Sequence, residues 1–467
     1  MDRRTFVCGM GAAALGAAAE SEPAPPGRPN ILFFFTDQQR WDTVDCYGRP
    51  LFPGLTPNLD AMAREGVRFD QAFTCQPVCG PARSCLMTGR WATQTGCWRN
   101  DIALPAGEPT LATMLGQAGY RTGYVGKWHL ASSGEKQNVQ ARAVPHELRG
   151  GFKDAWMAAD VLEFTSHGYG GHVFDAEGRQ VDFPDGRYRP DALTDYALRF
   201  LEEQDGERPW FLFLSYLEPH HQNDRNHFEG PEGSKQAYAG FRTPGDLAPL
   251  KGNWAEEMPD YLGACAALDR NLGRLRDALR KRKMLDNTLV VFTSDHGCHF
   301  RTRNNEYKRS CHDGSIRIPM VLRGPGFRRG RVVRDPVSLI DLPPTLLAAA
   351  GVAPVTPMGG AALQPVAAGS ERRSDVFLQI SESQVGRAVR TRRWKYAVQA
   401  PGKRGWVDSA ADSYRETHLY DLKADPDELH NLVADPAHAR TRAEMAALLI
   451  RRMREAGEAA PAILPAR

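Results

Sequence analysis

Two acidic residues stand directly after apolar runs that have the length and composition of buried strands. Asp37-Gln38 follows residues 30–35, and Asp295-His296 follows a run that ends at Thr293. Ligands of open sheets bind at the carboxyl ends of the strands, and hard divalent cations take oxygen donors. The spacing therefore predicts a divalent cation between the two pairs. An Asp after a strand also commonly caps a turn, so either pair alone would carry little weight.

A second group of reactive residues lies near residue 80. The chain reads Cys79-Gly80-Pro81-Ala82-Arg83, followed by Leu86 and by Thr88-Gly89-Arg90. This stretch resembles the C-x-P-x-R…T-G-R signature of the formylglycine-dependent type I sulfatases of the alkaline-phosphatase-like superfamily, in which the Cys is oxidised to an aldehyde. Cys75 and Cys85 do not fit: Cys79 stands where the first would need Arg, and the second lacks the following Pro.

The resemblance implies that Cys79 becomes formylglycine (3-oxoalanine), made by a formylglycine-generating enzyme. A hydrated aldehyde carries two geminal hydroxyls. One can attack sulfur and displace the alcohol, and deprotonation of the other then expels sulfate, so that no water need attack a sulfated enzyme. Arg83, about one helical turn beyond Cys79, can face the diol and neutralise its charge.

The same family places its metal ligands in the two strand-end motifs. The resemblance therefore implies a metal site of Asp37, Gln38, Cys79, Asp295 and His296. The family often has Asp-Asp in the first motif, and Gln38 departs from it, because an amide oxygen can coordinate but brings no charge. This favours Ca²⁺ and leaves Mg²⁺ open.

Two lysines and a histidine fall in further motifs of the family. Gly126-Lys127-Trp128-His129 resembles its G-K-W-H signature, which implies that Lys127 bridges the aldehyde and the sulfate and that His129 holds or deprotonates the diol. Otherwise this stretch could be a strand end with a snorkelling Lys. Lys308 resembles the sulfate-binding Lys that precedes the family's G-x-R-x-P segment, here residues 314–319.

Histidines elsewhere are candidates for contact with the substrate. Pro219-His220 resembles the family's P-H motif, whose His faces the leaving oxygen, so His220 is the predicted general acid for a sugar alkoxide. His221 is its neighbour, and His312 lies on the loop after Lys308, where a structural role is equally open. The loop 221–230, with Arg225 and His227, is a weaker candidate for substrate recognition.

These residues need a scaffold, and the chain from residue 30 alternates apolar runs with amphipathic ones. Strands are predicted at 30–35, 122–125, 210–216, 288–293 and 318–322, and helices at 57–65, 110–118, 191–203 and 259–284. This pattern predicts an α/β fold with a mostly parallel central sheet between helices. The resemblance identifies it as the large alkaline-phosphatase-like domain of a sulfatase.

The composition and the pattern of apolar runs change after about residue 351. A Pro- and Gly-rich stretch precedes short strand-like runs at 376–380, 386–391 and 394–398, and an amphipathic helix at 441–456 ends the pattern. A small C-terminal α+β domain with an antiparallel sheet is expected. The predicted division is 1–28 for a signal peptide and linker, 29–365 for the catalytic domain and 366–467 for the small domain.

Composition indicates an enzyme-sized soluble globule. Charged residues make up 25% and hydrophobic ones 42%, and a net charge of +3 without long Lys or Arg runs argues against a nucleic-acid partner. Arg3-Arg4 before a weakly apolar stretch resembles a twin-arginine signal cleaved near Ala19, although an Ala-rich first helix is the alternative. We expect an exported, periplasmic or secreted protein without a membrane span. Disulfide pairing and oligomeric state stay open.

These residues distinguish between three functions. The preferred one is a sulfatase acting on a sulfated sugar or polysaccharide. The alternative is a phosphonate or phosphate mono- or diester hydrolase, because relatives of sulfatases use the same aldehyde and metal, and some carry Asp-Gln and Asp-His motifs like those here. A noncatalytic binding protein should have lost a nucleophile or ligand, whereas Cys79, Arg83, Lys127 and Lys308 are all present.

Overall fold

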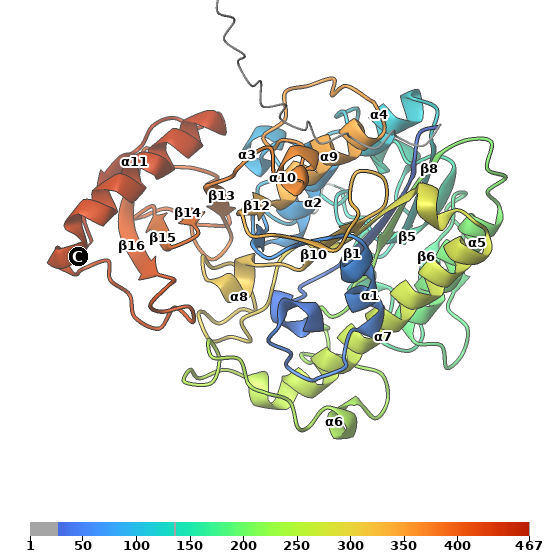
Figure 1. Ribbon diagram of the computed structural model, residues 1–467, viewed down its shortest axis with the longest axis horizontal. Helices are drawn as coiled ribbons and strands as arrows, with labels where there is room; N and C mark the ends of the chain where they lie inside the picture. The colour runs from blue at the N-terminus through green and yellow to red at the C-terminus, as the bar shows by residue number, and fades with distance from the viewer. Residues whose placement is uncertain (1–26, 135–136, 467) are drawn as a thin grey trace, which may run out of the picture.

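The computed structural model describes residues 27–134 and 137–466 (Figure 1). Its larger part is built on a ten-stranded sheet with the strand order β11-β2-β10-β9-β1-β8-β4-β5-β6-β7. The five neighbours β9-β1-β8-β4-β5 are parallel, whereas β10 is antiparallel to β9 and β2, and β6 to β5 and β7. The strands are β1 (Asn30–Thr36), β2 (Val67–Phe69), β4 (Arg121–Lys127), β5 (Ala155–Ala159), β6 (His172–Phe174), β7 (Gln180–Asp182), β8 (Trp210–Ser215), β9 (Thr288–Ser294), β10 (Met320–Arg323) and β11 (Arg331–Val333).

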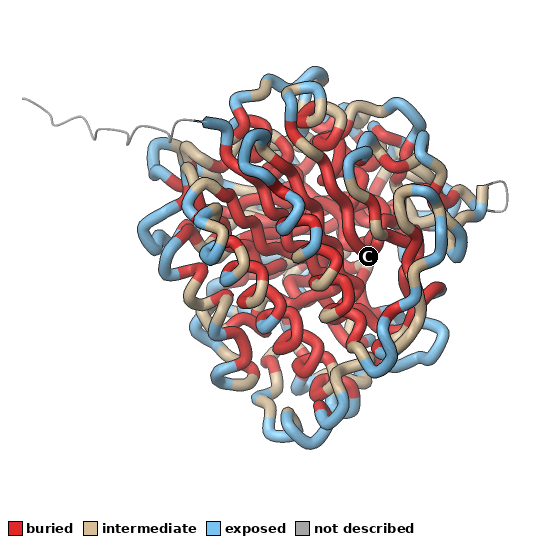
Figure 2. Tube along the Cα trace, turned by 90° about the vertical axis from the view of Figure 1, so that its right-hand side faces the viewer, coloured by how far each residue is buried: buried red, intermediate tan, exposed pale blue. Residues whose placement is uncertain are grey.

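Helices cover both faces of this sheet, because side chains of a strand alternate between the faces. In β1, Ile31, Phe33 and Phe35 belong to one apolar core, and Leu32 and Phe34 to the other. The first core includes α2 (Cys79–Thr88), α4 (Leu111–Gln117) and α9 (Leu342–Ala349), and the second includes α1 (Pro57–Glu65), α5 (Arg189–Glu202) and α7 (Trp254–Lys281). Figure 2 shows the buried interior that results. The predicted mostly parallel sheet between helices is confirmed.

The long helix α7 differs from its predicted bounds of 259–284. It begins at Trp254, so Pro259 lies inside it, and it ends at Lys281. Proline lacks the N–H that would bond the carbonyl four residues earlier. Because Pro259 lies near the start of the helix, the helix loses only one backbone hydrogen bond. At the other end Lys283 has a positive φ of 57°, which breaks the helical path before Met284.

A second, five-stranded sheet follows with the order β13-β14-β15-β16-β17. The first four strands are antiparallel, and the short β17 is parallel to β16. Helix α11 (Ala439–Glu455) packs Met445, Leu449 and Met453 into the same apolar cluster as Tyr396 and Leu419 of the sheet. The strands are β13 (Asp375–Ile380), β14 (Gly386–Thr391), β15 (Trp394–Gln399), β16 (Ser413–Asp421) and β17 (Ala462–Leu464). The small antiparallel sheet is confirmed, while the boundary between residues 365 and 366 stays a prediction.

Short elements connect these layers. They are a two-stranded sheet of β3 (Ala72–Phe73) and β12 (Val337–Ser338), and the helices α3 (Ala92–Thr95), α6 (Ser234–Ala237), α8 (Asp313–Ile316) and α10 (Gln364–Ala368). None of the helices in the described ranges combines the length and apolar character needed to cross a membrane. The predicted export signal, cleaved near Ala19, lies within residues 1–26, outside the described part of the chain.

Candidate active site

The carboxyl ends of neighbouring strands converge on one point. Asp37 follows β1, Asp295 follows β9, and Lys127 is the last residue of β4. The strand pairing continues into this edge, since the Asp295 amide donates to the Thr36 carbonyl at 3.2 Å and the Asp37 amide to the Glu218 carbonyl at 3.2 Å. The parallel sheet therefore brings together side chains that are up to 258 positions apart in the sequence, from Asp37 to Asp295.

Cys79 is the first residue of α2, and its thiol reaches the same point. Val78 before it is extended, and every residue of α2 is buried. Gly80 allows a close approach of Asn100, because a Cβ at this position would lie 2.9 Å from the Asn100 Oδ1 that accepts the Gly80 amide. One turn later, the Arg83 guanidinium donates to Asp37 at 3.0 Å and to the Lys127 carbonyl at 2.9 Å. Arg83 thus balances the strand-end carboxylates and locks the helix to the sheet edge.

Four buried side chains form a cluster that could hold a metal ion. Donor atoms of Asp37, Cys79, Asp295 and His296 all lie within 4.8 Å of one another. The Cys79 Sγ is 3.2 Å from His296 Nε2 and 3.4 Å from Asp37 Oδ1. His296 Nδ1 donates to the Gly297 carbonyl at 2.9 Å, which leaves the Nε2 lone pair facing the cluster.

Charge at this cluster fits a cation. Asp295 Oδ2 accepts no hydrogen bond from the described residues. Burial, and then the charge of Asp37, raise the pKa of Asp295 to about 7. A buried carboxylate with one oxygen free of hydrogen bonds, a second carboxylate and an imidazole nitrogen are a donor set that a hard or borderline divalent cation satisfies. Gln38 lies beside it with a φ of 67°; its amide nitrogen donates to Asp295 Oδ1, and its side-chain amide donates to the Cys298 sulfur at 3.4 Å.

Two lysines also approach the Cys79 sulfur. Lys308 Nζ is 2.9 Å from Sγ and Lys127 Nζ is 4.0 Å from it. Lys127 also pairs with Asp37 at 2.9 Å and with Glu163 at 3.2 Å. Burial opposes ionisation of the thiol, but Lys127, Lys308 and His296 outweigh it and hold the pKa of Cys79 well below its usual value. The position of Cys79 therefore stabilises negative charge.

His220 is held as a neutral imidazole against Lys308. Its Nδ1 donates to the His221 carbonyl at 2.6 Å, so Nε2 accepts from Lys308 Nζ at 3.0 Å. Burial and the charge of Lys308 lower the pKa of His220. His129 has a φ of 58°, and its backbone amide donates to the Asp160 carbonyl at 2.7 Å. Both imidazoles line the cavity described next.

A cavity of about 260 Å³ gives access to Cys79. Its lining contains Gln38, Cys79, Asn100, His129, Glu163, His220, Asn223, Glu306, Tyr307, Lys308, Arg309 and Trp406. Sequence reasoning missed several of these. Glu163 comes shortly after the end of β5, so the strand-end rule that found Asp37 could have found it. Trp406 comes from the loop between β15 and β16, and no local signal connects it to Cys79.

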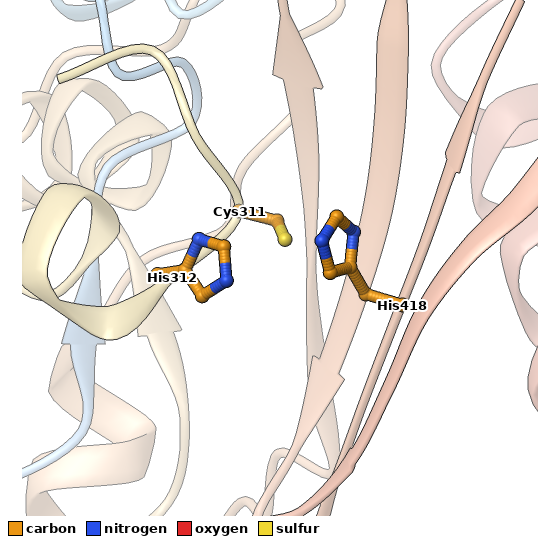
Figure 3. A group of neighbouring side chains, drawn as sticks. All are labelled: Cys311, His312 and His418. Carbon is orange, nitrogen blue, oxygen red and sulfur yellow. The ribbon is translucent and has the colours of Figure 1, made fainter. Parts of the chain in front are cut away.

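Neither of the two further histidines lines that cavity. His221 lies behind its wall, with its ring stacked on Tyr307 at 4.3 Å and its pKa lowered to about 4 by burial. His312 lies next to Cys311 and His418, as Figure 3 shows, and its Nε2 hydrogen-bonds the Tyr420 hydroxyl at 3.1 Å. This favours the structural role for His312.

The residues of the loop after His221 line two different cavities. Asn223 lines the Cys79 cavity. Arg225 and His227 lie instead at another cavity, of about 290 Å³, and both pair with Glu229, at 2.9 and 3.3 Å. The two residues proposed for substrate recognition thus do not share a cavity with Cys79.

The class that this fold and site define agrees with comparison to known proteins. The sequence model of the sulfatase family matches residues 29–352, and that of the N-sulphoglucosamine sulphohydrolase C-terminal region matches residues 306–455. The chain belongs to the sulfatase family and is a sulfuric ester hydrolase. The family resemblance noted in the sequence is confirmed.

Particular relatives are named for sulfated sugars. The chain is 30% identical over 412 residues to the ulvan-active sulfatase of Formosa agariphila, covering 84% of this chain and 77% of that protein. It is 25% identical over 529 residues to the N-acetylglucosamine-6-O-sulfatase of Bacteroides thetaiotaomicron, covering 95% and 90%.

Solved structures share the fold. A protein in complex with its substrate D-glucosamine-2-N,6-O-disulfate is similar with a TM-score of 0.72 at 24% identity, over 92% of this chain and 98% of that one. The phosphonate monoester hydrolase of Agrobacterium radiobacter gives 0.69 at 24% identity, over 92% and 96%. The large mixed sheet with a small second sheet is therefore the architecture of this group.

Proposed function

We propose that this chain hydrolyses sulfate esters of a sugar or polysaccharide, with a formylglycine made from Cys79 as nucleophile and a divalent cation beside it. One observation carries the proposal: the Cys79 sulfur stands within 3.4 Å of Lys308, His296 and Asp37, and Cys79 lines a cavity. The thiol sulfur marks the place that the oxygens of the hydrated aldehyde would take. Maturation by a formylglycine-generating enzyme is part of this proposal.

Asp37, Gln38, Asp295 and His296 would hold the cation together with an oxygen at position 79. When bound, the cation would lower the pKa of the attacking hydroxyl and draw charge from a sulfate oxygen. Ca²⁺ is the proposed ion, since the donors are mostly oxygens and Gln38 adds no charge. The hydrated aldehyde would supply one hydroxyl for attack at sulfur and a second whose deprotonation releases sulfate.

Charge on the sulfuryl group would be neutralised by the two lysines. Lys308 points from the cavity wall at position 79, and Lys127 reaches the same position from the sheet. Preorganised cations in a site without water stabilise charge in the transition state more than cations in water do, because no solvent has to reorganise. Glu163 pairs with Lys127 and so fixes its direction. Arg83 acts through Asp37, holding that carboxylate toward the cluster.

Proton transfers would fall to His220 and His129. A sugar alkoxide is a poor leaving group, so a donor at the leaving oxygen speeds its departure. His220 Nε2 faces the cavity next to Lys308, and a proton taken up there would serve this purpose. His129 stands near the Cys79 thiol and would remove the proton from the diol; its Nδ1 has no hydrogen-bond partner in the described part of the chain.

A phosphonate or phosphate ester hydrolase is the second candidate, favoured by the Asp37-Gln38 and Asp295-His296 pairs and by the likeness in fold to a phosphonate monoester hydrolase. The family assignment over residues 29–352 supports the sulfatase instead. We further propose export through the twin-arginine signal at the N-terminus to the periplasm or medium.

The deciding experiment is an assay of matured, metal-loaded protein against three matched sets of substrates: monosaccharide and oligosaccharide sulfates, 4-nitrophenyl sulfate, and phenyl phosphonate and phosphate esters. We expect kcat/KM to be highest for a sugar sulfate. A higher kcat/KM for a phosphonate monoester, by tenfold or more, would refute the sulfatase proposal in favour of the second candidate. The Cys79→Ala variant is the control for contaminating hydrolases.

A further inference from the structure

The outer wall of the Cys79 cavity carries an exposed tryptophan. Trp406 lines this cavity and is 46% exposed, one of few large apolar side chains on the described surface that are so open. Two guanidinium groups contact its ring: the carbons of Arg99 and Arg309 each lie 5.7 Å from the ring centroid. We call Trp406, Arg99 and Arg309 the rim group. An aromatic face at the mouth of a polar cavity is a site for a ring with both apolar and polar edges.

The two arginines differ in how their charge is used. Arg309 pairs with Glu306 at 2.9 Å and with Glu382 at 2.5 Å. Arg99, in contrast, forms no ion pair with any described residue. It donates one hydrogen bond to the Asn100 carbonyl at 2.7 Å, and its Nε is buried without a partner. The rim group thus contains one guanidinium with which no carboxylate of the described residues forms an ion pair.

The loop that carries Trp406 is fixed to the catalytic part of the chain. The Glu382 amide donates to the Gly405 carbonyl at 3.0 Å, and Glu382 Oε1 accepts the Asn100 amide at 2.7 Å. A Cβ on Gly405 would lie 2.5 Å from the Glu382 carbonyl oxygen, so only glycine allows this contact. Glu382 therefore ties together the Trp406 loop, Arg309 and the segment of Asn100. These contacts hold the rim group in a fixed position.

The size of the cavity determines what can reach this rim. About 260 Å³ is below the usual range of ligand pockets. A sulfate held at Lys308 and one sugar ring would fill much of this volume, and a longer substrate would extend toward the exposed lining residues, among which Trp406 is the aromatic one. Lys308 and Arg309 are adjacent in the sequence, so the sulfate end and the rim form one continuous wall.

We infer that the rim group is a second binding subsite, which stacks the neighbouring sugar of an oligosaccharide on Trp406 and pairs an anionic group of that sugar with Arg99. This rests on the proposed sulfatase function and names its substrate class: a sulfated oligosaccharide with a further anionic group next to the sugar that is desulfated. Sulfate and carboxylate share the required chemistry.

The test compares kcat/KM for four matched substrates: the monosaccharide sulfate that the enzyme hydrolyses best, and its disaccharides with a neutral, a carboxylated and a sulfated neighbour. The readout is the ratio of kcat/KM for each disaccharide to kcat/KM for the monosaccharide. Trp406→Ala should lower all three ratios by roughly tenfold, through KM, because stacking is uniform binding. Arg99→Gln should lower only the ratios of the anionic disaccharides, and the larger of the two losses identifies the preferred anion.

Val407→Ala is the matched control, because Val407 is exposed on the same loop but does not line the cavity. Trp406→Phe should restore most of the stacking. Equal kcat/KM for monosaccharide and disaccharides in the unmodified protein, or unchanged ratios in Trp406→Ala, would overturn the inference while leaving the sulfatase intact. Hydrolysis of phosphonate esters with no sulfate ester cleaved would instead overturn the proposed function.

Discussion

Removal of the His220 imidazole should separate leaving-group chemistry from sulfate binding. In the structure His220 Nε2 contacts Lys308 at 3.0 Å, and Lys308 contacts Cys79 at 2.9 Å. His220→Ala therefore removes two things: a hydrogen-bond partner of Lys308, and the group that we propose protonates the departing oxygen. The first loss affects every sulfate ester. The second affects only esters whose alcohol needs a proton.

The two losses have different sizes. One hydrogen bond contributes about 1 kcal/mol, which is about fivefold in rate at 1.36 kcal/mol per tenfold. General acid catalysis contributes about 10² to 10⁴-fold, or roughly 3 to 5 kcal/mol. We therefore expect His220→Ala to lower kcat/KM about fivefold for 4-nitrophenyl sulfate, whose phenolate leaves without a proton. For a sugar sulfate the loss should be at least about a hundredfold.

The assay measures kcat/KM for both substrates in His220→Ala, Lys308→Ala and His221→Gln. Lys308→Ala should lower both values together, by about 10² to 10³-fold, since Lys308 is proposed to neutralise the sulfuryl group whatever the alcohol. His221→Gln should affect both alike, because His221 lies outside the cavity. Equal losses for the two leaving groups in His220→Ala would refute the acid role and make His220 a sulfate-binding or pocket-shaping residue.

Four further outcomes are expected. Coexpression with a formylglycine-generating enzyme should convert Cys79 to the aldehyde, and peptide mass spectrometry should find intact thiols at Cys75 and Cys85; active protein with unmodified Cys79 throughout would contradict the mechanism. Chelation should abolish turnover, and Asp295→Ala should lose bound metal as measured by elemental analysis, whereas full metal content would remove Asp295 from the ligand set. Lys395→Met leaves Asp313 and Glu428 buried without their ammonium partner, so it should destabilise the fold by about 3 to 5 kcal/mol and lower the thermal midpoint; Lys403→Met, at an exposed pair, is the control. Burial, and then Lys395 and Arg303, lower the pKa of His418 to about 4, so the unfolded state binds the proton more tightly than the folded state. The stability that the neutral His418 contributes is complete above pH ~6.5 and is lost as pH falls toward 4. A thermal midpoint of His418→Gln that drops with acid as steeply as that of the unmodified protein would contradict this.

Local sequence determined the proposed nucleophile and the residues at strand ends. Cys79 and Arg83 are four positions apart, so the helix that begins at Cys79 is enough to place them on one side. Asp37, Asp295 and Lys127 come at the ends of apolar runs, and parallel pairing of such runs puts their ends at one edge. The gathering of these side chains could therefore be predicted without coordinates.

Only tertiary structure decided which other residues reach that edge. The motif resemblance favoured His220 over His221, and His220 lines the cavity. Loops after the strands have no periodicity, so sequence could not tell that His221 stacks on Tyr307 or that His312 hydrogen-bonds Tyr420. Trp406 joins the cavity because Glu382 holds its loop to the catalytic part of the chain. Such contacts join segments with no shared pattern; they depend on the packing of the small sheet against the large domain, which no local propensity encodes.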